Sequence, residues 1–258
     1  MLLPWSKPTT IALGANGIAI KSNGESSKPL VKLDRCYQSV TDLAASLSEV
    51  ASQIESKAVN ILLSNHFARY LVLPWQEGVT SRQEWVALAE HAFRNSFGPV
   101  AEQWEVRVSL NGYGERVVAC ALDQALIDSL KAIAVENQWQ ITAIEPLFMT
   151  ALHQIRLEHE NTWLLFGEPE RIVLAEYQQG EWESFSMINP PRGMELAQSQ
   201  QLLMRQLAQV EGARPKQVLT CLAPQLEGDL RIDGIHVKSL RIGNANKTNN
   251  CALWMASI

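Results

Sequence analysis

The stretch IALGANGIAIK, Ile11 to Lys21, decides how the rest of the chain is interpreted. Two runs of small and apolar residues flank the dipeptide Asn16-Gly17. An Asn-Gly pair between such runs is a strong signal for a β-hairpin, because both residues tolerate the positive φ angles of a tight turn. The sequence therefore predicts a strand, a turn and a second strand at the start of the chain.

A similar plan recurs in the second half of the chain. The apolar runs 163–166 and 171–177 are separated by Gly167-Glu168-Pro169-Glu170, and a Gln-Gln-Gly turn leads to a third run at 181–187. These patterns predict a three-stranded meander. Each half continues with a helix and a strand, predicted at 39–54 and 59–63 in the first half and at 194–210 and 217–222 in the second. A last short helix is predicted at 251–257.

The region between these halves has its own regular order. A strand at 68–73 ends at Pro74, and a helix begins at Ser81, whose capping box is completed by Glu84 three residues later. Alternating or apolar segments then predict two strands, a helix with Asp123 as its N-cap, and a final strand. The order is β-α-β-β-α-β, and the predicted segments after the first helix are 104–110, 116–122, 123–137 and 140–144.

Composition narrows the function classes. The chain has 258 residues, 47% of them hydrophobic, and a net charge of -5. A mildly acidic chain without Lys/Arg clusters is a poor candidate for nucleic-acid binding. Its longest apolar runs fall far below the roughly 20 residues of a membrane-spanning helix. The cysteines are widely spaced, so we expect free thiols, no metal site and a cytoplasmic protein. They are Cys36, Cys120, Cys221 and Cys251.

Catalytic motifs are absent from the sequence. Ser64-Asn65-His66 lacks the flanking glycines of a nucleophile elbow, and no phosphate-binding GxxxxGK[ST] motif occurs. The histidines show no metal-binding HxH or HExxH spacing. We therefore expect no catalytic residues and no enzyme activity.

Two segments carry a resemblance to a known family. They are NHFARYLVLPW at 65–75 and ERVVACALDQALIDSLKAIAVENQWQITAIEPLFMTALHQI at 115–155. The chain resembles the PilM family of type IV pilus assembly proteins and the cytoplasmic domain of the type II secretion protein GspL. The resemblance implies an α/β, actin-like (RNase-H-like) fold of two lobes, 1–160 and a shortened 161–258, with an inserted β-α-β-β-α-β subdomain at about 66–144. It leaves open whether the last helix packs back on the first lobe.

The same resemblance identifies two degenerate phosphate hairpins. Members of the superfold carry Asp-x-Gly in each hairpin, where the carboxylate holds Mg²⁺ on a nucleotide. Here Gly14 and Gly167 remain, but the aspartate positions are occupied by Ala12 and Leu165. A Gly pair expected near residues 221–224 is also missing. We therefore expect no bound ATP, Mg²⁺ or other cofactor. The open alternative is that Glu168 or Glu170 supplies a carboxylate from a shifted register.

The resemblance also implies a partner. In PilM-like proteins the inserted subdomain lies near the binding site for the cytoplasmic tail of PilN, an inner-membrane protein. Four aromatic residues of the corresponding region are therefore candidate contacts, although packing of the subdomain core explains each of them individually: Phe67, Tyr70, Trp75 and Trp85. The expected function is a scaffold that holds such a tail without ATP hydrolysis and reaches the membrane only through this partner. A weakly active, nucleotide-binding ATPase is the alternative, and self-association stays open.

Overall fold

The computed structural model describes most of the chain and divides it into two compact units. The described residues are 8–22, 26–33, 36–157, 161–169, 171–189, 201, 204–205, 214–223, 231–232, 234–240 and 255–256. One unit contains the described residues of 1–67, 123–154 and 242–258, and the other contains those of 68–122 and 155–241. The helices predicted at 194–210 and 251–257 lie largely outside the described residues. The described residues within them, 201, 204–205 and 255–256, are helical.

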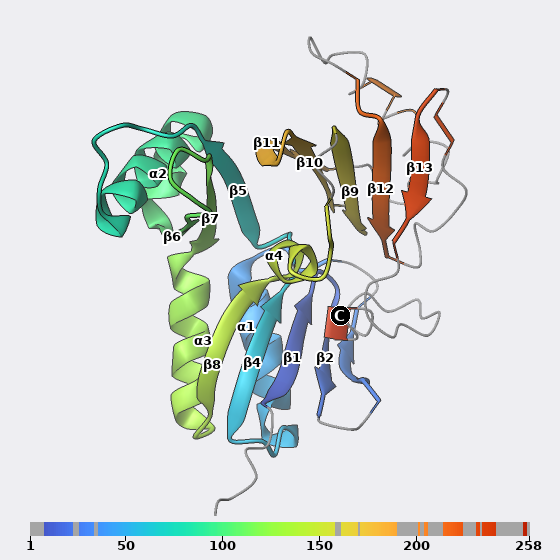
Figure 1. Cartoon of the computed structure of the whole chain (residues 1–258). Helices are drawn as coiled ribbons and strands as arrows, with labels where there is room; N and C mark the ends of the chain where they lie inside the picture. Colours follow the sequence, from blue (N-terminus) through green and yellow to red (C-terminus); the bar gives the residue numbers. More distant parts are fainter. Residues whose placement is uncertain are drawn as a thin grey trace, which may run out of the picture. The chain divides into compact units, whose positions relative to one another are not determined.

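A five-stranded sheet organises the first unit (Figure 1). Its order is β3-β2-β1-β4-β8. The β1–β2 and β2–β3 pairs are antiparallel, whereas β4 runs parallel to both β1 and β8. The strands are β1 Thr9–Gly14, β2 Gly17–Lys21, β3 Lys28–Lys32, β4 Ala58–Leu63 and β8 Gln140–Pro146.

Amphipathic helices bury their apolar residues in the first unit. The side chain of Ser39 accepts from the Asp42 amide at 3.1 Å at the start of one helix, and Asp123 accepts from the Ala125 amide at 2.9 Å at the start of another. Both caps satisfy amides that a helix leaves without intrahelical partners. The helical segments are α1 Val40–Val50, η1 Ala51–Gln53, α3 Gln124–Glu136 and α4 Leu147–Leu152, and α1 contacts α3.

The second unit contains a sheet of the same design. The order β11-β10-β9-β12-β13 repeats the pattern of the first sheet, with antiparallel pairs up to β9 and parallel pairs from β9 to β13. The strands are β9 Thr162–Glu168, β10 Arg171–Gln178, β11 Glu181–Ile188, β12 Gln217–Leu222 and β13 His236–Ser239. The predicted meander is therefore confirmed, and the chain contains an internal structural repeat.

The second unit also holds an inserted segment with a separate small sheet. Its strand order is β5-β7-β6, and its helix α2 contributes Trp85, Ala89 and Phe93 to a core shared with β6 and β7. The predicted capping box is confirmed, because Ser81 accepts from the Glu84 amide and Glu84 accepts from the Ser81 amide. The elements are β5 Ala68–Leu73, α2 Arg82–Phe97, η2 Pro99–Gln103, β6 Trp104–Ser109 and β7 Val117–Asp123.

The inserted segment groups with the second unit. The resemblance implies an inserted subdomain at about 66–144; in the structure α3 and β8 group with the first unit, where β8 pairs with β4. The shorter segment 68–122 instead groups with the second unit. Two contacts explain this grouping: the rings of Tyr70 and Phe185 lie 6.2 Å apart, and Arg116 donates to Glu183 at 2.7 Å.

Candidate partner-binding site

The first hairpin has the expected shape but no acidic side chain at the critical position. Ala12 is fully buried and pairs with Ala19 on one side and Leu62 on the other. The turn residues are Ala15 and Asn16, closed by a Gly14–Gly17 pair. A methyl group cannot ligate a cation, so the residue at position 12 does not fit the magnesium role of the superfold.

The tip of this hairpin is held by the chain itself. The carbonyl oxygens of Ala15 and Asn16 accept hydrogen bonds from the amides of Tyr37 and Leu33 at 2.7 and 2.8 Å. A side chain at Gly17 would place its Cβ 2.5 Å from a carbonyl oxygen of β3. This close approach explains why glycine lies in the strand, one position beyond the turn predicted from Asn16-Gly17.

The second hairpin repeats this loss. Leu165 is buried in an apolar cluster with Trp163 and Leu174 on one face of the sheet. The carbonyl oxygen of Gly167 accepts from the Ala223 amide at 2.8 Å. The position that would carry the second carboxylate therefore belongs to the hydrophobic core.

The alternative carboxylate, Glu168, has an internal environment. It is fully buried, and it lies opposite Arg171 in the register of β9 and β10 at the end of the hairpin. Glu170 lies outside the described residues. Burial and the nearby Arg69 guanidinium lower the pKa of Arg171 to about 10, and Glu168 acts in the opposite direction. Burial also raises the pKa of Tyr70 well above its ordinary value, with Cys120 and Glu168 adding to the shift. Glu168 thus acts as a counter-charge inside the second unit.

The four aromatic candidates divide into buried and accessible residues. Tyr70 and Trp85 are buried, the first against Phe185 and the second in the core of the inserted segment. Their burial matches the packing interpretation of these two residues. Phe67 is half-buried and belongs to the first unit, and Trp75 is half-buried in the second. The structure therefore does not gather all four side chains on one surface.

Tyr113 adds an aromatic residue that the sequence analysis missed. Its side chain is 90% exposed, and its ring centroid lies 5.1 Å from that of Trp75 in an edge-to-face arrangement. Trp75 in turn lies 5.3 Å from Trp85, which fixes it to the core. The sequence signal was an aromatic residue between the two glycines of the turn NGYGE. The Trp75–Tyr113 pair, which packs on the buried Trp85, is an aromatic surface of the kind that anchors protein partners.

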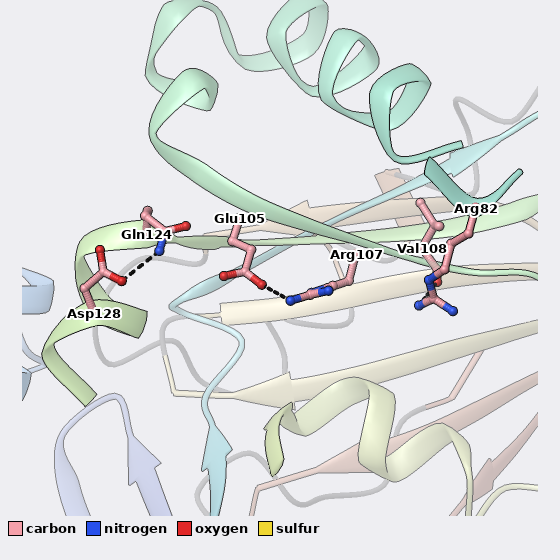
Figure 2. A network of polar contacts seen from close by, with 6 residues as sticks. All are labelled: Arg82, Glu105, Arg107, Val108, Gln124 and Asp128. Carbon is pink, nitrogen blue, oxygen red and sulfur yellow. Dashed lines mark hydrogen bonds and ion pairs between the residues drawn. The ribbon is translucent and has the colours of Figure 1, made fainter. Parts of the chain in front are cut away.

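Side-chain hydrogen bonds occur in the inserted segment and in α3 (Figure 2). Arg82, at the start of α2, donates to the carbonyl oxygen of Val108 in β6 at 2.9 Å, and Arg107 bonds to Glu105 within the same strand. The side chain of Gln124 donates to Asp128 at 2.9 Å within α3. The first contact joins the helix of the inserted segment to its outer strand, and the second lies within that strand.

Two features are absent from the described residues. Within the described ranges, no group of three or more His, Cys, Asp or Glu side chains could hold a metal ion. In the same part of the chain, no helix is long and apolar enough to cross a membrane. The candidate site is the aromatic surface that Trp75 and Tyr113 form on the inserted segment.

Comparison with known proteins gives structural relatives. No family model matches the chain, and no curated protein matches it in sequence. The cytoplasmic domain of EpsL, an inner-membrane component of the type II secretion system of Vibrio cholerae, aligns with a TM-score of 0.61 and 9% identity, over 96% of this chain and 92% of that one. The PilM–PilN type IV pilus biogenesis complex aligns with a TM-score of 0.57 and 12% identity, over 92% and 89%.

A third similar structure has an actin-like ATPase fold. A Bacteroides thetaiotaomicron protein of unknown function with an actin-like ATPase fold aligns with a TM-score of 0.53 and 14% identity, over 86% of this chain and 85% of that one. Identities this low show the fold alone. The predicted actin-like fold is confirmed, and the structural likeness to the PilM and GspL groups agrees with the resemblance seen in the sequence.

Proposed function

We propose that this chain is a non-hydrolysing scaffold in an inner-membrane assembly platform of the type IV pilus or type II secretion kind. The observation that carries the proposal is the pair of apolar residues, Ala12 and Leu165, at the two positions where the superfold places magnesium ligands. Fold likeness to the EpsL cytoplasmic domain and to the PilM–PilN complex supports the assignment to such a platform. Phosphoryl transfer depends on bound metal ions, so a domain that lacks both magnesium-binding carboxylates would use the same fold for binding only.

The proposed action is capture of a membrane subunit's cytoplasmic tail. An extended peptide binds by burying a few apolar side chains and adding backbone hydrogen bonds. The exposed Tyr113 ring and the half-buried Trp75 offer an apolar surface on the inserted segment, and Trp75 packs on the buried Trp85. The scaffold would work in the cytoplasm and reach the inner face of the membrane through its partner.

Isothermal titration with synthetic tails tests this proposal. The tails are those of single-helix membrane proteins encoded beside this gene, and we expect one to bind with measurable heat and to raise the melting temperature. Trp75→Ala and Tyr113→Ala should weaken binding by about tenfold each, as interface anchors do. Val135→Ala is the matched control, because Val135 is an exposed apolar residue on α3 in the first unit.

Two outcomes would contradict separate parts of the proposal. Absence of binding by every neighbouring tail would reject the scaffold function. Binding that is unchanged in both aromatic variants would keep the function but reject the Trp75–Tyr113 surface as its site.

The second candidate function is a nucleotide-binding, weakly active ATPase of the same fold. The buried carboxylate of Glu168, one residue after Gly167 in the second degenerate hairpin, favours it. Saturating Mg·ATP would then stabilise the chain by RT ln(1 + [L]/Kd), which is about 2.7 kcal/mol at 100 times Kd. A melting temperature that does not change at millimolar Mg·ATP would eliminate this alternative.

A further inference from the structure

The outer strand of the inserted sheet, β6, has one unpaired edge in the part of the chain that the structure describes. The sheet order is β5-β7-β6, so β7 covers one side of β6 and no described strand covers the other. The opposite edge strand, β5, instead contacts β11. An open edge presents backbone amide and carbonyl groups that can pair with another strand.

The side chains of β6 divide cleanly between its two faces. Val106 and Val108 point into the core of the inserted segment. Glu105 and Arg107 lie on the other face and bond to each other, with Arg107 73% exposed and Glu105 23% exposed (Figure 2). A charge of each sign therefore lies symmetrically on either side of Val106.

We propose that β6 pairs antiparallel with β6 of a second copy of this chain, around a twofold axis at Val106. In this register Glu105 lies opposite Arg107 of the other copy, and the reciprocal pair forms on the other side of the axis. Opposite residues of antiparallel strands share a face, so both ion pairs would form on the outer face of the joined sheet. The proposal does not depend on tail binding or on nucleotide.

Neighbouring registers that keep the valines inward are electrostatically unfavourable. Moving the axis to Glu105 places two glutamates opposite each other, and moving it to Arg107 places two arginines opposite each other. Like charges directly opposite destabilise a strand pair, whereas opposite charges stabilise it. The pattern Glu-Val-Arg therefore selects one register, and that register is self-complementary, as a twofold interface requires.

Exposed apolar residues flank both ends of β6. Phe97 and Val100, 39% and 51% exposed, precede the strand, and Leu110, 44% exposed, follows it. Antiparallel pairing around Val106 brings Leu110 of one copy toward the segment of the other copy that contains Val100. The ring of Phe97 is held at this end by Trp104, at a centroid distance of 5.3 Å. The same symmetry thus covers apolar surface at both ends of the ribbon.

The bond from Arg82 to the Val108 carbonyl oxygen is compatible with this pairing. A carbonyl oxygen has two lone pairs and can accept a second hydrogen bond. The six residues of β6 and their flanks make a small interface, and interfaces burying less than about 1,200 Å² are usually weak. We therefore expect a reversible dimer that is populated at high micromolar concentration.

Sedimentation velocity of the full chain at low ionic strength tests the proposal, because salt screens exposed ion pairs. The wild type should shift reversibly from monomer to dimer over a dilution series that reaches about 300 µM, a range suited to a weak interface. Arg107→Glu and Glu105→Arg should each weaken self-association by about tenfold or more, since each replaces two attractive pairs with two repulsive pairs.

Two recombinations make the test specific to this register. The double exchange Glu105→Arg/Arg107→Glu restores the self-complementary pattern and should dimerise like the wild type. An equimolar mixture of the two single variants should form a mixed dimer, because every acidic side chain of one then faces a basic side chain of the other. Lys131→Glu, on the exposed surface of α3, controls for the change in net charge, and circular dichroism verifies that each variant is folded.

Each contrary outcome would overturn the proposal. A wild type that stays monomeric throughout the series rejects self-association, and a dimer that persists in both single variants places the interface elsewhere. Single variants whose association is restored neither by the double exchange nor by mixing reject the register around Val106.

Discussion

Replacing Trp85 with alanine separates a packing role from a partner-binding role for the aromatic residues of the inserted segment. Trp85 is 2% exposed, and its ring centroid lies 5.3 Å from that of Trp75. Truncating a buried tryptophan costs about 3–5 kcal/mol, because the cavity it leaves collapses only partly. The lost aromatic pair adds about 0.5–1.5 kcal/mol. We therefore expect a loss of about 3.5–6.5 kcal/mol, a large share of the roughly 5–15 kcal/mol that stabilises a typical domain.

Guanidinium unfolding monitored by far-UV circular dichroism measures this loss, since removing a tryptophan alters the fluorescence baseline. Trp75→Ala is the control, because its half-buried side chain should cost less than about 2 kcal/mol when truncated. Trp85→Phe should retain most of the stability and all of the tail binding. A loss of less than about 1 kcal/mol for Trp85→Ala would refute the assignment of this residue to the core.

Ser81→Ala removes the N-cap of α2 and should lower the free energy of unfolding by about 1 kcal/mol and the Tm by about 2–4 °C; an unchanged Tm would contradict the capping box. Backbone hydrogen bonds from Ser81 and its neighbour hold the pKa of Glu84 below its ordinary value, so its stabilising effect is present above the unfolded-state pKa and is lost as pH falls through the folded-state pKa. The urea-midpoint difference between wild type and Glu84→Gln should accordingly shrink from neutral pH to about pH 3, and a difference that grows would reverse the sign of the argument. Burial raises the pKa of Cys120 and of Cys221 to about 12. Iodoacetamide should therefore modify both thiols at least about tenfold more slowly in the native protein than in urea, as mass spectrometry of cysteine peptides would show; equal rates would mean that the thiols are accessible.

Local signals in the sequence predicted local structure well. The hairpin around Asn16-Gly17, the capping box of Ser81 and the N-cap of Asp123 all depend on residues within a few positions of one another. Their energetics are set by short-range hydrogen bonds and backbone preferences, which are the same wherever the segment lies. The actin-like fold itself was predicted from the resemblance of residues 65–75 and 115–155 to a known family.

Long-range pairing limited the rest of the prediction. The order β-α-β-β-α-β suits a self-contained module, but whether β8 pairs within the module or with β4 depends on contacts between residues about eighty positions apart. The grouping of the insertion with the second unit likewise depends on Tyr70 meeting Phe185. Neither partner choice leaves a periodic trace in the sequence.

The candidate site was predictable in part for the same reason. An aromatic residue in a strand pattern, such as Tyr70, is consistent with either a core or a surface role until the covering element is known. Trp75 was identified because its region resembles a known family, but its contact with Tyr113 joins two turns that are distant in sequence. The charge pattern of Glu105 and Arg107 was visible, yet its meaning required knowing that β6 is an edge strand.

The first and last strands of the inserted segment, β5 and β7, pair with each other and bring its two ends together. Ala68 pairs directly with Leu122, so the chain leaves the first unit and returns to it at neighbouring points. Because the two ends of the insertion are held together by their own pairing, the loop-closure entropy that the insertion costs the first unit depends little on its length. Such an arrangement lets the inserted surface diversify, lengthen or acquire new partners while the sheet that carries it keeps its own folding requirements unchanged.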